Sequence, residues 1–307
     1  MALLVAVALS GCGVGFGAGD GKGEARLTVS RDYGSQVLFE ETVGPVRESS
    51  TVMRLLDGEA DIETSYGGGF VDSIDGIDSS SGSRSFDWFY FVNGVAAERG
   101  AGEFVARPGD RIWWDYRDWT GAMEVNAVVG SFPAPLAGGY DGTKWPVEVV
   151  CLDAARACRI AAGRLSDAGV EFDLTGAGGA GAGSLRILVG TWRAVARDRD
   201  AAKLAVGPAG SGVFAGFTGS GPSSRLIGFD SRGAESTAFG PGVGLVAAMR
   251  RGSQPPLWLV TAAGAAGVEA AAGALEAGEL GNRYAVAVSK AGVESLPTDL
   301  GGGGEAR

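Results

Sequence analysis

A cysteine near the start of the chain carries the most specific chemistry in the sequence. Residues 2–9 form a short apolar run, and Leu9-Ser10-Gly11-Cys12 closes it. This pattern is typical of the bacterial lipobox, in which a small residue precedes a cysteine that is acylated and becomes the mature N-terminus. The run is too short to span a bilayer, which needs about 20 apolar residues. Residues 1–12 are therefore predicted to be a lipoprotein signal peptide and lipobox, with Cys12 as the lipidated residue.

Lipidation of Cys12 would place the folded chain on the extracytoplasmic face of a bacterial cell membrane, with the lipid bilayer as its first partner. No Lys or Arg precedes the apolar run, unlike in most signal peptides, and the alternative is a cysteine that follows a buried strand by chance. Residues 13–25 are rich in glycine and have no hydrophobic period, so they are predicted to be a flexible tether.

Two further cysteines, Cys151 and Cys158, lie close together in the sequence. In an exported chain such a pair is best explained as a disulfide. The spacing allows a bridge only if Cys151 ends a strand and Cys158 lies in the following helix, because seven residues along one helix would be too far. A redox-active pair is the alternative, although such pairs normally have two intervening residues.

Several classes of activity lack their usual residues. The chain has no histidine, no G-x-S-x-G or S-x-x-K nucleophile motif and no P-loop, so we expect neither an enzyme nor a bound cofactor. The glycine run of residues 176–183 contains the letters of a dinucleotide-binding motif, but a strand and not a helix is expected to follow it, so a plain connection is preferred. Asp72, Asp75 and Asp78 could offer oxygen ligands to a hard cation, but their spacing departs from the calcium-loop pattern, and turn-forming aspartates are the preferred explanation, with no metal site. A formal charge of −10 argues against nucleic acid as a partner.

The aromatic residues are concentrated between residues 85 and 119. Alternation along two predicted strands separates a core face from a second face whose aromatics exceed what a small domain normally buries. The core face is predicted to contain Trp88, Tyr90, Trp114 and Tyr116. Exposed aromatics beside charged side chains are typical of a surface that binds a small molecule or a partner. The predicted ligand-binding residues are Phe89, Phe91, Trp113, Arg117 and Trp119.

The same stretch carries a recognisable motif, in which Trp88, Tyr90, Asn93 and Gly94 form W-x-Y-x-x-N-G. Residues 73–77 (SIDGI) precede it, and a P-G-D-R-I-W-W run follows. This part of the chain resembles the DUF4430 domain of bacterial lipoproteins, also called the transcobalamin-like C-terminal domain. The resemblance covers roughly the N-terminal third and implies a β-grasp, ubiquitin-like fold. Because this domain closes over cobalamin in the transcobalamin relatives, it also implies a corrinoid-like ligand as one candidate.

The expected fold is α+β, with a β-grasp domain over residues 26–132 followed by a separate α/β domain with a mixed sheet over residues 147–290. Residues 133–146 concentrate proline and glycine and are predicted to be the linker. In the second domain a strand, a helix and a strand follow one another as in a βαβ unit. Residues 291–307 are predicted to be a disordered tail.

These expectations favour a membrane-anchored extracytoplasmic lipoprotein that binds a small molecule. The alternative is an envelope adaptor that binds other proteins, such as a transporter, and has no small-molecule ligand.

Overall fold

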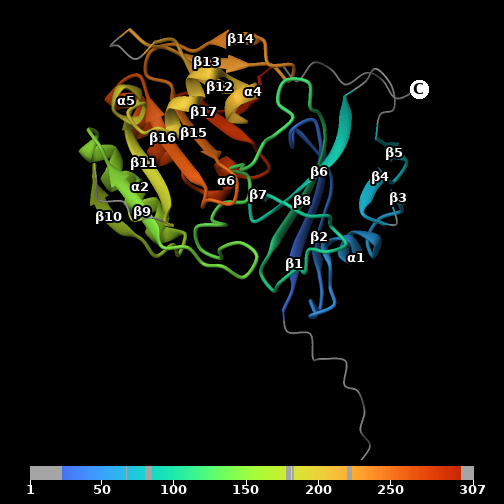
Figure 1. Ribbon diagram of the computed structural model, residues 1–307. Coiled ribbons are helices and arrows are strands. Elements are labelled where there is room, and N and C mark those ends of the chain that lie inside the picture. Colours follow the sequence, from blue (N-terminus) through green and yellow to red (C-terminus); the bar gives the residue numbers. More distant parts are fainter. Residues whose placement is uncertain are drawn as a thin grey trace, which may run out of the picture.

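The computed structural model describes residues 23–66, 68–79, 85–177, 181, 183–219 and 223–298. Within these ranges the protein is a mixed α+β structure, with four β-sheets and few helices, as expected for the fold class (Figure 1). No helix in the described ranges is both long and apolar enough to cross a membrane. The predicted lipidation site at Cys12 and most of the predicted tether lie outside the described residues.

The first sheet contains the aromatic stretch. Its strands, in chain order, are β1 (Ala25–Arg31), β2 (Gln36–Val43), β6 (Phe86–Val92), β7 (Val95–Ala96) and β8 (Arg111–Asp118). They lie in the order β2-β1-β8-β6-β7, with β1 and β8 parallel in the middle and the other pairs antiparallel. Asn93 and Gly94 form the two-residue turn between β6 and β7, with φ of 53° and 75°, as the sequence predicted.

One face of this sheet packs on the helix α1 (Val52–Asp57) and on a small antiparallel sheet. The small sheet consists of β3 (Ile62–Ser65), β4 (Phe70–Ile74) and β5 (Ile77–Asp78). Thr51 caps the helix, because its hydroxyl accepts a hydrogen bond from the Arg54 backbone N–H. Trp88 and Trp114 are buried on this face, as predicted.

The largest sheet has seven strands and lies beside the first one (Figure 1). Its strands, in chain order, are β9 (Val147–Cys151), β10 (Asp173–Gly176), β11 (Leu185–Thr191), β15 (Gly244–Met249), β16 (Leu257–Ala262), β17 (Ala285–Ser289) and β18 (Gly292–Leu296). The order is β10-β9-β11-β16-β15-β17-β18, in which the first four strands are parallel and the remaining pairs are antiparallel. The predicted mixed sheet is therefore present.

Two helices cover one face of the seven-stranded sheet, α2 (Ala155–Asp167) and α5 (Ala265–Gly273). Cys151 is the last residue of β9 and Cys158 lies in α2, the arrangement that the sequence required for a disulfide. The two residues form that disulfide, with their Cα atoms 5.8 Å apart.

The other face of the sheet packs against shorter elements and against the first sheet. The shorter elements are α3 (Trp192–Val195), the 3₁₀ helix η1 (Ala201–Val206), α4 (Pro208–Ser211), and the three-stranded sheet of β12 (Ala215–Phe217), β13 (Leu226–Phe229) and β14 (Glu235–Ala238). The short helix α6 (Ala277–Leu280) lies on the side of α2 and α5 instead, because its Leu280 packs in their core. The predicted linker, residues 133–146, is mostly turns, and it contributes Leu136 to the core beneath α2 and α5 and Tyr140 to the core of the first sheet.

The prediction of a disordered tail is wrong for residues 292–296. This segment forms β18, which pairs antiparallel with β17 through a tight turn between Ser289 and Gly292. The segment has few apolar side chains, so its sequence gives only a weak signal for a strand. In the folded protein Leu296 is buried in the core, and the backbone of β17 supplies the hydrogen-bond partners of β18. Residues 299–307 lie outside the described residues.

Candidate ligand-binding groove

The second face of β6 and β8 is largely covered by the rest of the chain. Phe91 and Trp113 are only 1% and 2% exposed, and both pack in a core that includes residues of β11, β15 and β17. The expectation that these two aromatics are exposed is therefore wrong. The surplus of aromatic surface is real, but the molecule removes it from water by packing the larger sheet against it.

A buried polar network joins the two sheets at this interface. Asp115, on β8, accepts hydrogen bonds from the Ser30 hydroxyl at 2.6 Å, the Gly34 backbone N–H at 3.0 Å and the Tyr284 hydroxyl at 3.0 Å. The indole N–H of Trp113 donates to the Ser30 hydroxyl at 2.7 Å. Burial raises the pKa of Asp115 to about 6, although the hydrogen bonds it accepts and the nearby Arg117 charge act to lower it.

At the open side of β6 the first sheet leaves a cavity of about 300 Å³, here called the aromatic groove. β8 pairs with the whole of β6 on one side, whereas β7 pairs only with its last two residues on the other, so residues 86–90 have no strand beside them on that second side among the described residues. The groove is lined by Met53, Phe70, Val71, Trp88, Phe89, Tyr90, Phe91, Ala97, Arg99, Trp114, Arg117, Met123, Glu124, Val125 and Asn126, with several small residues between them.

Aromatic rings form the walls of the groove. Tyr90 and Trp114 stack with their centroids 4.9 Å apart and their planes 27° apart. The Trp88 indole N–H donates to the Ile77 carbonyl at 2.9 Å, which fixes that ring. Burial raises the pKa of Tyr90, so its phenol stays neutral at physiological pH. The walls therefore offer rigid, uncharged ring surfaces.

Arg117 brings a buried positive charge to the groove. It is 1% exposed, and its guanidinium donates to the carbonyls of Ala122 at 2.8 Å and Met123 at 3.0 Å. Its Cζ lies 3.8 Å from the centroid of the Phe89 ring, a cation–π contact. Within the described ranges it forms no ion pair, so carbonyl dipoles and the ring face stabilise the charge.

Two buried donors on residues that line the groove have no hydrogen-bond partner in the described part of the chain. They are Nε of Arg117 and the indole N–H of Trp114. A buried donor without a partner costs about 1–3 kcal/mol. The arrangement is suited to a molecule with a largely apolar body and at least one hydrogen-bond acceptor.

The structure brings three of the five predicted ligand-binding residues to the groove. Phe89, Phe91 and Arg117 line it, whereas Trp113 and Trp119 do not. Trp113 lies in the interface between the sheets. Trp119 is partly buried, and its indole N–H donates to an Asp87 carboxylate oxygen at 2.7 Å.

Sequence reasoning missed the residues at the mouth of the groove. Phe70 and Met123 are 39% and 62% exposed, which is unusual for side chains of this size. Both come from segments without strong hydrophobic alternation, so no period marks them as facing a site. Asp75, considered as a metal ligand, lies in the turn between β4 and β5, where its carboxylate accepts from the Asp61 backbone N–H at 2.9 Å.

Residues 49–118 match the model of the family described as "Domain of unknown function (DUF4430)". The resemblance identified from the W-x-Y-x-x-N-G motif is therefore confirmed for this part of the chain. No curated protein matches the sequence.

Two solved structures are similar to about a third of the chain. A protein from Ruminococcus gnavus, described as a candidate metal-binding protein, is 18% identical, and the match covers 32% of this chain and 98% of that one with a TM-score of 0.26. Haptocorrin in complex with Cbi is 14% identical, also with a TM-score of 0.26, and the match covers 31% of this chain and only 25% of haptocorrin.

Proposed function

We propose that the chain is an extracytoplasmic, lipid-anchored binding protein whose aromatic groove holds a small, largely apolar molecule with a hydrogen-bond acceptor. The observation that carries the proposal is the groove itself, in which stacked rings surround about 300 Å³ and two of the lining residues carry a buried donor without a partner. Sites for small molecules are concave and mostly apolar, with a few polar groups that fix orientation. The groove volume is at the lower end of their usual range.

The proposed location rests on the cysteines. The lipobox at Cys12 is the basis for the anchor, and the Cys151–Cys158 disulfide is consistent with an oxidising compartment outside the cytoplasm. For the first sheet we propose the β-grasp fold that the family resemblance implies. The β1–β2 hairpin, the helix α1 and the central parallel pairing of β1 with β8 support it.

The size of the groove limits the ligand. A corrinoid, proposed by family resemblance, is larger than the groove, so only one edge of it would be enclosed while the rest lay at the mouth beside Phe70 and Met123. A flat ring of one or two fused cycles would fit inside entirely. Its acceptor would face Arg117 or Trp114, where the unpartnered donors lie.

A fluorescence titration tests this proposal. We suggest 8-anilinonaphthalene-1-sulfonate as the first probe, since it combines fused rings with an anionic acceptor, and cyanocobalamin as the second. Binding should be saturable in the folded protein and should change tryptophan emission, because Trp88 and Trp114 line the groove. Near-ultraviolet circular dichroism recorded on the same samples would establish that the tertiary packing is intact.

The matched variants are Phe70→Ala and Tyr66→Ala. Both remove an exposed aromatic ring from the β3–β4 hairpin, but only Phe70 lines the groove. Loss of one ring contact is worth about 1–1.5 kcal/mol, so Phe70→Ala should weaken probe binding roughly tenfold while Tyr66→Ala binds as the parent does. No saturable binding of either probe, or equal effects of the two variants, would refute the groove as the site.

One observation favours the alternative of an envelope adaptor. Residues 86–89 of β6 have no strand partner on the side of the groove among the described residues, and such an edge can accept an extended segment of another protein. A photo-crosslinker at Phe70 would then capture one defined envelope protein in cells. Under the small-molecule proposal it would capture no protein reproducibly.

A further inference from the structure

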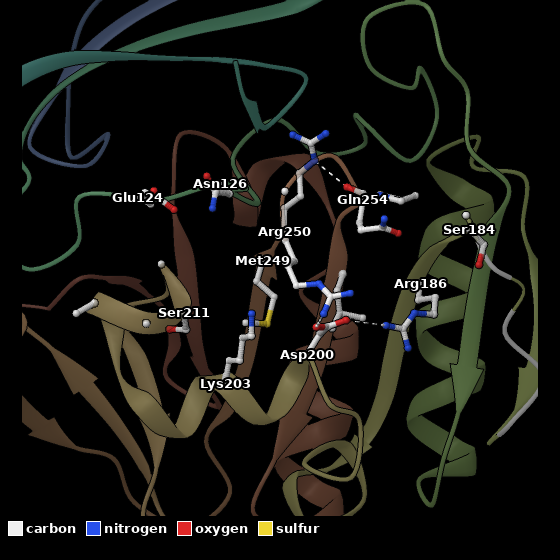
Figure 2. A pocket seen from close by; sticks show the side chains of 18 of the residues that line it. Glu124, Asn126, Ser184, Arg186, Asp200, Lys203, Ser211, Met249, Arg250 and Gln254 are labelled. Atoms are coloured by element: carbon white, nitrogen blue, oxygen red, sulfur yellow. Dashed lines mark hydrogen bonds and ion pairs between the residues drawn. The ribbon is translucent and has the colours of Figure 1, made fainter. Parts of the chain in front are cut away.

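A second cavity, of about 490 Å³, lies on the other side of the segment that closes the aromatic groove. Glu124 and Asn126 line both cavities, so this segment separates them. The second cavity lies at one end of the three central strands of the seven-stranded sheet (Figure 2). Arg186 and Leu257, at the starts of β11 and β16, and Met249, at the end of β15, line it there. We refer to it as the polar cavity.

Charged side chains distinguish the polar cavity from the aromatic groove. Four cationic residues line it, Arg186, Lys203, Arg250 and Arg251, against two acidic ones, Glu124 and Asp200. The whole chain carries a formal charge of −10, so this local excess of cations runs against its overall balance. Such an excess within a concave site concentrates anions there.

Two of the four cations are already engaged in holding the fold. Arg250 donates to a Glu98 carboxylate oxygen at 2.9 Å and to the Gln254 carbonyl at 2.8 Å, which ties the larger sheet to the first one. Its side chain is only 4% exposed. Arg186 is paired with Asp198.

The side chains of the other two cationic residues have few or no partners within the described ranges. Lys203 is partly buried on η1, and its ammonium group forms no hydrogen bond or ion pair within the described ranges. Arg251 has one ion pair, to Asp200 at 3.6 Å, which is longer than a hydrogen bond, and its side chain is 49% exposed. The side-chain amide of Asn126, which also lines the cavity, forms no hydrogen bond in the described part of the chain either. Figure 2 shows Lys203 and Asn126 on opposite walls.

We propose that the polar cavity binds a small molecule through an oxyanion, a carboxylate or a phosphate, held by Lys203 and Arg251. A guanidinium presents paired donors that match the two oxygens of such a group, and an ammonium adds a point charge. The Asn126 amide lies where it can bind a polar group at the far end of the same molecule. This site goes beyond the function proposed for the aromatic groove and does not depend on it.

Isothermal titration calorimetry of the full chain tests the site, with citrate and inorganic phosphate as probes at low ionic strength. We expect saturable binding of at least one probe at one site per chain. Lys203→Gln should weaken that binding at least about tenfold, because a charged hydrogen bond is lost, and Arg251→Gln should do the same. The matched control is Lys290→Gln, which makes the same change in charge at an exposed lysine that does not line the cavity.

Circular dichroism melting curves would show that the variants fold, and Arg251→Gln provides a second test should Lys203→Gln fail to fold. Absence of saturable binding for both probes would overturn the proposal. So would binding that Lys203→Gln and Lys290→Gln weaken equally, since the probe would then respond to overall charge. Titration of the aromatic groove with its fluorescent probe should be unchanged in Lys203→Gln, so failure at one site is distinguishable from failure at the other.

Discussion

The hydroxyl of Tyr284 donates a hydrogen bond to Oδ2 of Asp115 at 3.0 Å, and both residues are buried although they are 169 positions apart in the sequence. Tyr284 immediately precedes β17 of the larger sheet, and Asp115 lies in the middle of β8 in the first. The ring of Tyr284 also meets Phe91 and Trp113 edge-on, with centroids 5.5 and 5.4 Å away. This tyrosine therefore makes both polar and apolar contacts across the interface.

The carboxyl of Asp115 makes stability depend on pH. Burial raises its pKa from 3.8 to about 6, so the folded chain binds this proton more tightly than the unfolded chain does. Protonated Asp115 therefore adds to the free energy of unfolding. This contribution is complete below about pH 4 and is lost as the carboxyl of the folded chain loses its proton, when the pH rises through about 6. The difference amounts to about 3 kcal/mol at 1.36 kcal/mol per pKa unit.

Asp115→Asn isolates this effect, because asparagine does not titrate. We expect the free energy of unfolding of the parent, minus that of the variant, to fall by about 3 kcal/mol between about pH 3.5 and pH 6.5. Urea unfolding at a series of pH values measures it. A difference that stays constant or rises with pH would contradict the raised pKa of Asp115.

Close approach of the two sheets at Gly34 gives a second prediction. Gly34 has φ of +79°, and a methyl group there would clash with the Asn282 carbonyl and lie 2.7 Å from the Trp113 ring. Gly34→Ala should therefore unfold at clearly lower urea concentration than the parent. Gly76→Ala is the control, since Gly76 has φ of +76° but no atom within 4 Å of the added methyl.

Both substitutions carry the strain of a positive φ, which costs about 1 kcal/mol. Only Gly34→Ala adds the clash, so it should be the more destabilising by at least about 1–3 kcal/mol, the usual range for overpacking. Equal midpoints for the two variants would show that the interface opens at little cost.

The disulfide supplies a third prediction. Cys151 and Cys158 close a short loop between β9 and α2, and the chain-entropy model assigns such a loop about 2–3 kcal/mol. The double variant Cys151→Ser and Cys158→Ser should lose about that much in the free energy of unfolding. Thiol counting on the unreduced parent should find neither cysteine free, and two reactive thiols would contradict the bridge.

Local patterns in the sequence determined much of the fold. Alternation along β6 and β8 assigned Trp88 and Trp114 to one face and Phe91 and Trp113 to the other, because side chains of a strand point alternately to its two sides. The Asn93-Gly94 turn and the Cys151–Cys158 pairing were also predictable, since each depends on neighbours in the chain. So was the family of residues 49–118, through its motif.

Only the tertiary structure decided what covers each face. Whether Trp113 lies in water or in a core depends on Tyr284 and its neighbours, which approach from far along the chain, and alternation carries no information about them. The two cavities have the same origin, because Glu124 and Asn126 lie in an irregular segment whose position is set by packing between two sheets. A local pattern specifies which side chains share a face, whereas burial and the shape of a site depend on long-range contacts.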